Sequence, residues 1–161
     1  MDGLTKARWL ALLAPLALMA GALGSQYIGG LIPCEMCMWQ RWPHYAAIAV
    51  AALAFAVPNR MGATALVAVA ALLIATSGVI GVLHAGVEYH WWPGFTPCTA
   101  GLDSGMSGLD IIDKIRHGPM IRCDLAQWSL LGISLAGWNA IVSLSGATAI
   151  FALLLFKRPR G

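Results

Sequence analysis

The stretch PCEMCMWQRWPH, residues 33–44, lies between two long apolar runs. It contains a Cys-x-x-Cys motif formed by Cys34 and Cys37, and Arg41 follows four residues after the second cysteine. Thiols in this motif often have lowered pKa values, and a nearby cation stabilises the reactive thiolate. The stretch therefore predicts thiol–disulfide chemistry at the edge of an apolar segment.

The composition is that of a membrane protein. Of the 161 residues, 59% are hydrophobic and 11% are charged, and the mean hydropathy is +0.74. Soluble domains carry roughly 25% charged residues, so this chain lacks the polar side chains that a water-exposed surface needs. The net charge of +3 is too small to indicate nucleic-acid binding. The length fits a single domain over residues 1–161, embedded in a lipid bilayer.

Stretches without charged residues predict where the chain crosses the membrane. A membrane-spanning helix needs about 20 mostly apolar residues, with a range of about 17–25. Four segments meet this requirement, at about 9–28, 42–58, 62–84 and 132–156. The sequence therefore predicts an all-α membrane protein, a bundle of four transmembrane helices. Two loops, at about 29–41 and 85–131, lie on the same side of the membrane.

The second of these loops contains a further predicted helix over residues 107–115. Ser107 resembles a helix cap, and Leu109, Ile112 and Ile115 fall on one face of the segment. We expect a short amphipathic helix that lies either on the membrane surface or against the loop itself.

The N-terminal segment has an alternative interpretation. Lys6 and Arg8, followed by an apolar run and small residues, resemble a secretory signal peptide. The apolar run continues to Ile32, beyond the hydrophobic region of such a peptide, and its removal would leave an odd number of spans. We therefore interpret it as the first transmembrane helix.

The basic residues predict the orientation. With four spans, the side of the termini holds Lys6, Arg8, Arg60, Lys157, Arg158 and Arg160, and the side of the loops holds Arg41, Lys114, Arg116 and Arg122. Lys and Arg are enriched in cytoplasmic segments, so both termini are expected in the cytoplasm. All four cysteines then lie on the opposite side, in the compartment where disulfides persist.

Cys34, Cys37, Cys98 and Cys123 allow three disulfide connectivities. The short spacing favours a reactive, reducible Cys34–Cys37 bond, which leaves Cys98–Cys123 as the second pair. This second bond closes a loop of about 25 residues, and its simplest interpretation is a stabilising one. The alternative is a zinc site with all four thiolates as ligands. An oxidising compartment and the lack of a second Cys-x-x-Cys motif argue against that metal site.

Arg41 and His44 share a helical stripe with Cys37, because they follow it by four and seven residues. A guanidinium there can stabilise a thiolate or donate to a carbonyl oxygen of a flat, lipid-soluble acceptor such as a quinone. The alternative is an interfacial arginine that extends toward water. The position beside Cys37 favours function, and we take Arg41 and His44 as candidate cofactor-binding residues. His84 and His90 show no metal-ligand spacing and are expected in a loop or at an interface.

Three features resemble the DsbB-type disulfide bond formation proteins. They are the Pro33-Cys34-x-x-Cys37-x-x-x-Arg41 motif, the loop cysteines Cys98 and Cys123, and Trp128-x-Leu130-Leu131-Gly132 before the last span. The resemblance covers nearly the whole chain in order and spacing. It implies a four-helix protein of the bacterial inner membrane, with its cysteines on the periplasmic side, that reduces quinone and serves disulfide bond formation and protein folding.

The resemblance also implies a role for each cysteine. Cys98 would form a mixed disulfide with the partner, a periplasmic DsbA-like thiol oxidase, and Cys123 would be paired with Cys98. The Cys34–Cys37 pair would then accept the electrons, and Cys37 would lie against ubiquinone or menaquinone with Arg41 beside it. A DsbA–DsbB–quinone chain of this kind keeps the bacterial periplasm oxidising. Some family members carry an acidic residue just before the arginine, where this chain has Gln40.

Two other assignments compete with this resemblance. A vitamin K epoxide reductase-like protein also combines a membrane bundle with a Cys-x-x-Cys motif and loop cysteines. There, however, the motif usually comes late in the chain and the loop pair early, which is the reverse of the order here. A membrane protein that binds a metal through four cysteines would hold four thiolates in place of two disulfides.

Overall fold

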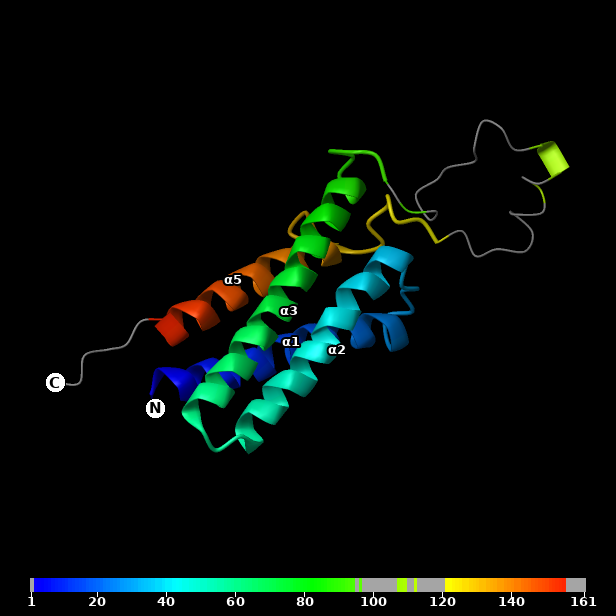
Figure 1. The fold of residues 1–161 in the computed structure, drawn as a ribbon. Coiled ribbons are helices and arrows are strands. Elements are labelled where there is room, and N and C mark those ends of the chain that lie inside the picture. Colours follow the sequence, from blue (N-terminus) through cyan, green and yellow to red (C-terminus); the bar gives the residue numbers. More distant parts are fainter. Residues whose placement is uncertain (1, 95, 97–106, 110–111, 113–120, 156–161) are drawn as a thin grey trace.

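The computed structural model describes residues 2–94, 96, 107–109, 112 and 121–155. Within these residues, four long helices pack side by side as a bundle (Figure 1). They are α1 (Gly3–Tyr27), α2 (Glu35–Ala56), α3 (Arg60–Glu88) and α5 (Leu135–Leu155). Two short strands, β1 (Ser129–Leu130) and β2 (Ile133–Ser134), precede α5. The mostly helical architecture agrees with the all-α prediction.

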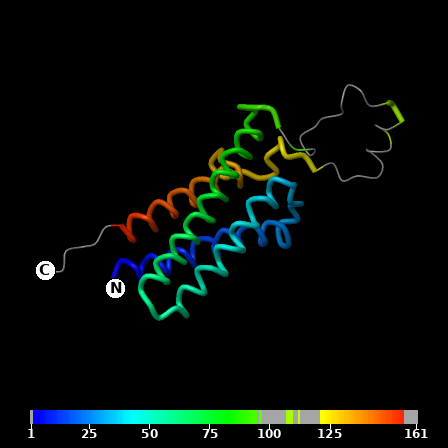
Figure 2. Tube along the Cα trace, viewed as in Figure 1, coloured from blue at the N-terminus to red at the C-terminus, as the bar shows by residue number. Residues whose placement is uncertain are grey.

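One end of the bundle joins the start of α1, the start of α3 and the end of α5. Asp2 caps α1 by accepting a hydrogen bond from the backbone N–H of Thr5 at 2.9 Å, and its Oδ2 lies 2.7 Å from Nη1 of Arg60. The hydrogen bond from the Thr5 hydroxyl at 2.6 Å above all, then that from Arg60 and that from the Thr5 N–H, hold the pKa of Asp2 below its usual range. A Cβ on Gly3 would lie 2.7 Å from the carbonyl oxygen of Leu153. Successive helices therefore run in alternating directions (Figure 2).

Three of the helices, α1, α3 and α5, are long and apolar enough to cross a membrane. The fourth, α2, has 22 residues, but its first half carries Glu35, Gln40, Arg41 and His44. The predicted second span, 42–58, falls mainly on the alanine-rich second half of α2. The count of four spans stays a prediction.

Helix caps extend two helices beyond the predicted spans. Because Asp2 caps α1, this helix begins at Gly3, well before residue 9. Asn59 caps α3 by accepting from the N–H of Gly62 at 2.6 Å, so this helix begins at Arg60. At its other end α3 continues past residue 84 to Glu88. The extra turn carries Glu88 alongside the cysteines.

Pro43 lies inside α2 and does not end it. The helix runs unbroken from Glu35 to Ala56, so it does not start afresh after the proline. Proline lacks an N–H and leaves one carbonyl of the preceding turn without its helical donor. The continuous helix places Cys37, Arg41 and His44 on the same face, which lines a cavity described below.

Small residues allow close packing at the centre of the bundle. Several alanines of α2 and α3 are fully buried: Ala47, Ala51, Ala54, Ala63, Ala70 and Ala71. Val67, Ile74 and Ile150 belong to the same core. Small side chains let helix backbones approach closely, which is the usual way helices associate within membranes.

A β-hairpin that the sequence analysis did not predict lies between the second loop and α5. Ser129 pairs with Ser134 and Leu130 with Ile133, in antiparallel register. The turn consists of Leu131 at φ 54° and Gly132 at φ 76°, and a two-residue hairpin turn of this kind requires positive φ at both positions. The last helix therefore begins at Leu135 and not near residue 132.

Parts of the second loop fall outside the described residues. Of the predicted helix over 107–115, Gly108, Leu109 and Ile112 are helical, and the remainder is not described apart from Ser107. Cys98 also lies outside the described residues.

Candidate active site

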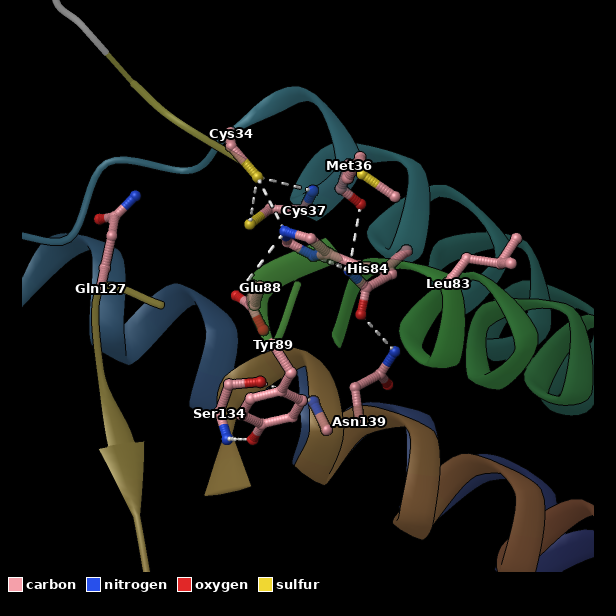
Figure 3. Close-up of polar contacts among 12 residues, drawn as sticks. Cys34, Met36, Cys37, Leu83, His84, Glu88, Tyr89, Gln127, Ser134 and Asn139 are labelled. Atoms are coloured by element: carbon pink, nitrogen blue, oxygen red, sulfur yellow. Dashed lines mark hydrogen bonds and ion pairs between the residues drawn. The ribbon is translucent and has the colours of Figure 1, made fainter. Parts of the chain in front are cut away.

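Cys34 and Cys37 lie at the start of α2 and face each other (Figure 3). Cys34 caps the helix, and its Sγ accepts a hydrogen bond from the backbone N–H of Cys37 at 3.2 Å. The two Sγ atoms are 2.9 Å apart, and the Cys34 thiol donates to Cys37. Both residues are thiols in this structure. The predicted Cys34–Cys37 disulfide stays a prediction for the oxidised form.

The contact between the two thiols determines where the negative charge of the pair lies. The hydrogen bond to Cys37 and burial raise the pKa of the Cys34 thiol. Cys34 therefore keeps a proton that it shares with Cys37, and Cys37 carries the thiolate character. Because thiolates are the reactive form of cysteine, this arrangement makes Cys37 the candidate nucleophile of the reduced pair.

Cys123 lies against this pair. It is fully buried and disulfide-bonded, and its Sγ lies within 4.8 Å of Sγ of Cys34. Cys34, Met36, Val87 and Cys123 form one buried cluster at this end of the bundle. The structure thus brings the long second loop back to the Cys-x-x-Cys motif. The predicted pairing of Cys123 with Cys98 involves a residue outside the described part of the chain.

His84 of α3 contacts Cys34 and also donates a hydrogen bond to the backbone of Cys123. Its side chain is 2% exposed, and its Nε2 lies 3.6 Å from Sγ of Cys34. Nδ1 accepts a hydrogen bond from Nε2 of Gln40 at 2.8 Å. Gln40 Nε2 also donates to the carbonyl oxygen of Met36 at 3.1 Å, which fixes the orientation of the amide. Because Nδ1 is an acceptor, the ring proton of His84 is on Nε2.

Glu88 follows His84 by one helical turn. Its side chain is 7% exposed, and Oε1 lies 3.7 Å from Nε2 of His84. Oε2 is buried and has no hydrogen-bond partner among the described residues. The carboxyl group also accepts a hydrogen bond from the side chain of Ser134, which favours the carboxylate, whereas burial disfavours its charge.

Arg41 is held by α1. Nη1 donates to Oε1 of Gln26 at 2.5 Å, and Nη2 donates to the carbonyl oxygen of Ala22 at 3.1 Å. The residue is 8% exposed, so it does not extend into water as an interfacial arginine would. A guanidinium has five N–H donors, and those not used by α1 remain for a ligand.

His44 belongs to a polar network between α2, α3 and α5. Its Nε2 lies 2.9 Å from Oδ1 of Asn139 and 2.9 Å from Oγ of Ser77. Asn139 Nδ2 in turn donates to Oε1 of Gln40 at 2.8 Å. Two acceptors at Nε2 place the ring proton there. Nδ1 of His44 is then a buried lone pair, and it has no partner among the described residues.

A cavity of about 210 Å³ connects these groups. Its polar lining consists of Cys34, Cys37, Gln40, Arg41, His44, His84, Glu88, Arg122, Gln127 and Asn139, and the remaining wall is mostly apolar, from α1, α5 and the loops. An apolar cavity with a few convergent polar groups is the usual form of a small-molecule site. A quinone ring fits this chemistry, because its carbonyl oxygens need donors such as Arg41 and its reduced hydroxyl groups need acceptors such as Nδ1 of His44.

The metal alternative receives little support from the same geometry. The ligand atoms of Cys34, His84 and Cys123 lie within 4.8 Å of one another. Cys123 is disulfide-bonded, however, so its sulfur is not a thiolate ligand. The arrangement fits sulfur exchange better than a site built from four cysteine thiolates.

The sequence indicates Cys34, Cys37, Arg41 and His44 as residues of this cavity, but it assigns no site role to the other polar residues of the lining, among them His84 and Glu88. His84 was expected in a loop or at an interface, and Glu88 was assigned no role. A His and a Glu separated by four residues share a helix face. Their position at the end of a long apolar helix was the signal that could have identified them.

Comparisons with known proteins agree with these features. The family model described as "Disulfide bond formation protein DsbB" matches residues 5–154. The chain is 33% identical to the disulfide bond formation protein B of Aromatoleum aromaticum, over 98% of this chain and 95% of the relative. It is 34% identical to the protein of that name from Burkholderia pseudomallei, over 95% and 92%, and 31% identical to that from Polaromonas sp., over 92% and 88%. No solved structure gives a significant match.

These matches cover nearly the whole chain, and they favour this family over the vitamin K epoxide reductase-like alternative. They agree with the buried cysteines and with helices that can cross a membrane. The chain belongs to the DsbB family of disulfide bond formation proteins, which are thiol oxidoreductases of the membrane.

Proposed function

We propose that this protein reoxidises a periplasmic DsbA-like thiol oxidase and passes the electrons to a membrane quinone. The observation that carries the proposal is the approach of Sγ of Cys123 to within 4.8 Å of Sγ of Cys34. This approach joins one residue from each proposed pair, Cys98–Cys123 and Cys34–Cys37. Cys37, the other member of the second pair, lines the cavity.

Thiol–disulfide exchange then accounts for the electron path. A thiolate of the reduced partner attacks Cys98, breaks the Cys98–Cys123 bond and releases Cys123. Cys123 attacks Cys34 of the oxidised Cys34–Cys37 pair, and Cys37 leaves as a thiolate. The second partner thiol then releases Cys98, which attacks Cys123 and frees Cys34. The partner leaves oxidised, and its two electrons and two protons remain with the protein.

The cavity residues suit a quinone as the electron acceptor. A bound quinone takes up two electrons and two protons to become a quinol. Cys37 carries the thiolate character of its pair and faces the cavity. Arg41 offers donors beyond those bonded to Gln26 and Ala22, and His44 offers the lone pair of Nδ1. We assign these three residues to quinone binding, with ubiquinone or menaquinone as the ligand.

The same proposal includes the membrane arrangement. We place the single domain in the bacterial inner membrane, with α2 as the fourth span. The bundle end that carries Asp2 and Arg60 faces the cytoplasm, and the cysteines face the periplasm. The positive-inside rule supports this orientation.

Quinone reduction by membranes that contain the protein tests the function. Reduced DsbA-like protein is supplied, and ubiquinone is compared with menaquinone. The Cys37→Ser variant is expected to reduce neither. The Cys98→Ser variant is expected to lose the reaction with the partner while dithiothreitol still reduces its Cys34–Cys37 bond. Quinone reduction by the Cys37→Ser variant would contradict the mechanism.

A further inference from the structure

The single N–H donor of His84 faces three acceptors, which are Sγ of Cys34, a carboxylate oxygen of Glu88 and the backbone carbonyl of Cys123. Gln40 fixes the ring proton on Nε2, and this atom lies 3.6 Å from Sγ of Cys34 and 3.7 Å from Oε1 of Glu88. Figure 3 shows the imidazole between the two groups. One N–H cannot serve all of these acceptors fully. When Cys34 and Cys37 share negative charge, the His84 donor is drawn to the sulfur, and a carboxylate at Glu88 is left with the hydrogen bond from the Ser134 side chain.

Burial increases the effect of this competition on the charge of Glu88. The side chains of His84 and Glu88 are 2% and 7% exposed, and Oε2 of Glu88 has no partner among the described residues. Adding the charge of a reduced cysteine pair beside a buried carboxylate is unfavourable, because like charges repel strongly where water is excluded. Binding a proton at Glu88 removes that repulsion.

We propose that Glu88 is a redox-coupled proton-binding residue, which takes up a proton when Cys34–Cys37 is reduced and releases it into the cavity when the pair is oxidised. The proposal rests on the proposed function for the role of the cavity. Oε1 of Glu88 is linked to the cysteine pair by the imidazole of His84, which lies near both groups. Glu88 also lines the cavity. His84 is the positioning residue, because its Nε2–H acts at Cys34 and Glu88 in turn.

The electron and proton counts then balance. Two electrons break the Cys34–Cys37 bond and leave two sulfurs that share one proton across their 2.9 Å contact. The second proton is bound by Glu88. Both protons come from the two thiols of the partner. Reforming the bond releases two electrons and two protons, which is the number that reduction of a quinone to a quinol consumes.

Other charged groups near Glu88 must be considered in any pH experiment. They are Cys34, Cys37 and Arg41 from the start of α2, His84 from α3, and Arg122 from the loop. Cys123 is disulfide-bonded and does not titrate. Arg41 and Arg122 stay charged at all working pH values. Substitution of Glu88 therefore separates the proton that Glu88 binds on reduction from protons bound by these other groups.

Redox equilibration of the purified full-length protein with dithiothreitol, without quinone, tests the proposal. Below its own thiol pKa values, dithiothreitol releases two protons with its two electrons. The redox state of Cys34 and Cys37 is read by acid quenching, alkylation and peptide mass spectrometry between pH 6 and about 8, below the thiol range near 8.5. If the wild-type pair and Glu88 together bind two protons, the equilibrium constant is independent of pH.

Glu88→Gln retains the size of the side chain but cannot bind the second proton. Its equilibrium constant is expected to change tenfold per pH unit, with reduction of the pair becoming more favourable as the pH rises. Glu88→Asp keeps a carboxyl group and is expected to stay close to pH-independent. Glu35→Gln, which removes an exposed carboxylate beside Cys34, is the matched control and is expected to match the wild type. A pH-independent Glu88→Gln variant, or a tenfold slope in the wild type, would overturn the proposal.

Infrared difference spectra of the reduced minus oxidised protein give a second readout. A carboxylic acid band is expected on reduction by dithiothreitol, and it should be absent in Glu88→Gln and present in Glu35→Gln. A band that persists in Glu88→Gln contradicts the assignment. Because neither measurement contains quinone, failure here is distinct from failure of the Cys37→Ser test of the oxidase function.

Discussion

The side-chain amide of Gln40 donates a hydrogen bond to Nδ1 of His84 at 2.8 Å and thereby fixes the proton of that ring on Nε2. The same amide accepts from Asn139 at its oxygen, so it cannot turn over without losing both bonds. One residue thus connects the network around His44 to the ring that contacts Cys34. Gln40 occupies the position where some members of the family carry an acid. Substitution of Gln40 by glutamate therefore tests the donor role of its amide.

Gln40→Glu is expected to move the ring proton of His84. A carboxylate accepts and does not donate, so Nδ1 would carry the proton toward it, and Nε2 would lose the proton that it offers to Cys34. Nitrogen chemical shifts of ¹⁵N-labelled histidine check this, since protonated and unprotonated ring nitrogens differ. Ser143→Ala, which removes a hydroxyl bonded to Asn139 at 2.9 Å, is the control and should leave His84 unchanged. An unchanged His84 in Gln40→Glu would show that the amide does not set the tautomer.

The approach of Cys123 to Cys34 predicts a disulfide that can be trapped. In the double variant Cys37→Ser, Cys98→Ser, the two remaining cysteines have Sγ atoms within 4.8 Å in the native arrangement. Mild oxidation is therefore expected to join Cys34 to Cys123 within one chain. Peptide mapping without reduction detects the bond. The control Cys34→Ser, Cys98→Ser leaves Cys37 and Cys123 and should cross-link more slowly, and equal rates would argue against the specific approach.

The contacts of Arg41 with α1 predict that its substitution weakens quinone binding more than it disturbs the rest of the protein. Arg41→Lys keeps the charge but loses the planar fork that bonds Gln26 and Ala22. A lost hydrogen bond to a charged group corresponds to about 1.5–3 kcal/mol, so KM for quinone should rise roughly ten- to hundredfold. Gln26→Ala should raise KM less. The rate of partner oxidation at saturating quinone is measured alongside KM. If this rate falls by as large a factor as the quinone affinity, the role of Arg41 is purely structural.

Burial and hydrogen bonding at Cys34 predict the direction of a pH shift. The bond to Cys37 is the leading reason that the pKa of Cys34 is raised, so removing the Cys37 thiol should lower it. In Cys37→Ala, the midpoint of the pH dependence of Cys34 alkylation by iodoacetamide is therefore expected at lower pH than in the reduced wild type. Glu35→Gln controls for the loss of a nearby negative charge. A midpoint that stays in place or rises would contradict the assigned direction.

The sequence predicted those parts of the site that depend on spacing within one segment. Uncharged runs indicated the helices, and helical periodicity placed Cys37, Arg41 and His44 on one stripe, which lines the cavity. Helix ends were less predictable, because caps such as Asp2 and Asn59 continue a helix past its apolar run.

Contacts between segments could not be predicted from the same patterns. His84 and Glu88 reach Cys34 only because α2 and α3 pack together through small residues, and the approach of Cys123 requires the second loop to return to the motif. The hairpin depends on Leu131 at positive φ, where no Asn-Gly or Asp-Gly signal marks the turn. Each of these features is a property of packing between elements.

The packing of Trp92 on Gly86 provides a final test of that loop arrangement. A Cβ at Gly86 would overlap the indole ring of Trp92, whose Nε1 donates to the carbonyl oxygen of Leu83 at 3.0 Å. Trp92 also packs against the buried cluster that holds Cys34 and Cys123. Gly86→Ala is therefore expected to lower the free energy of unfolding by about 1–3 kcal/mol, as overpacked cores do. Thermal unfolding in detergent measures the change.

The matched control is Gly24→Ala in α1, where no atom lies within 4 Å of an added Cβ. Alanine favours a helix over glycine by up to about 1 kcal/mol, so this variant should be neutral or more stable. Gly86→Ala should in addition slow the trapping of the Cys34–Cys123 disulfide, because displacement of Trp92 loosens the cluster, whereas Gly24→Ala should not. Normal stability and trapping in Gly86→Ala would show that Trp92 does not hold the second loop against the cysteines.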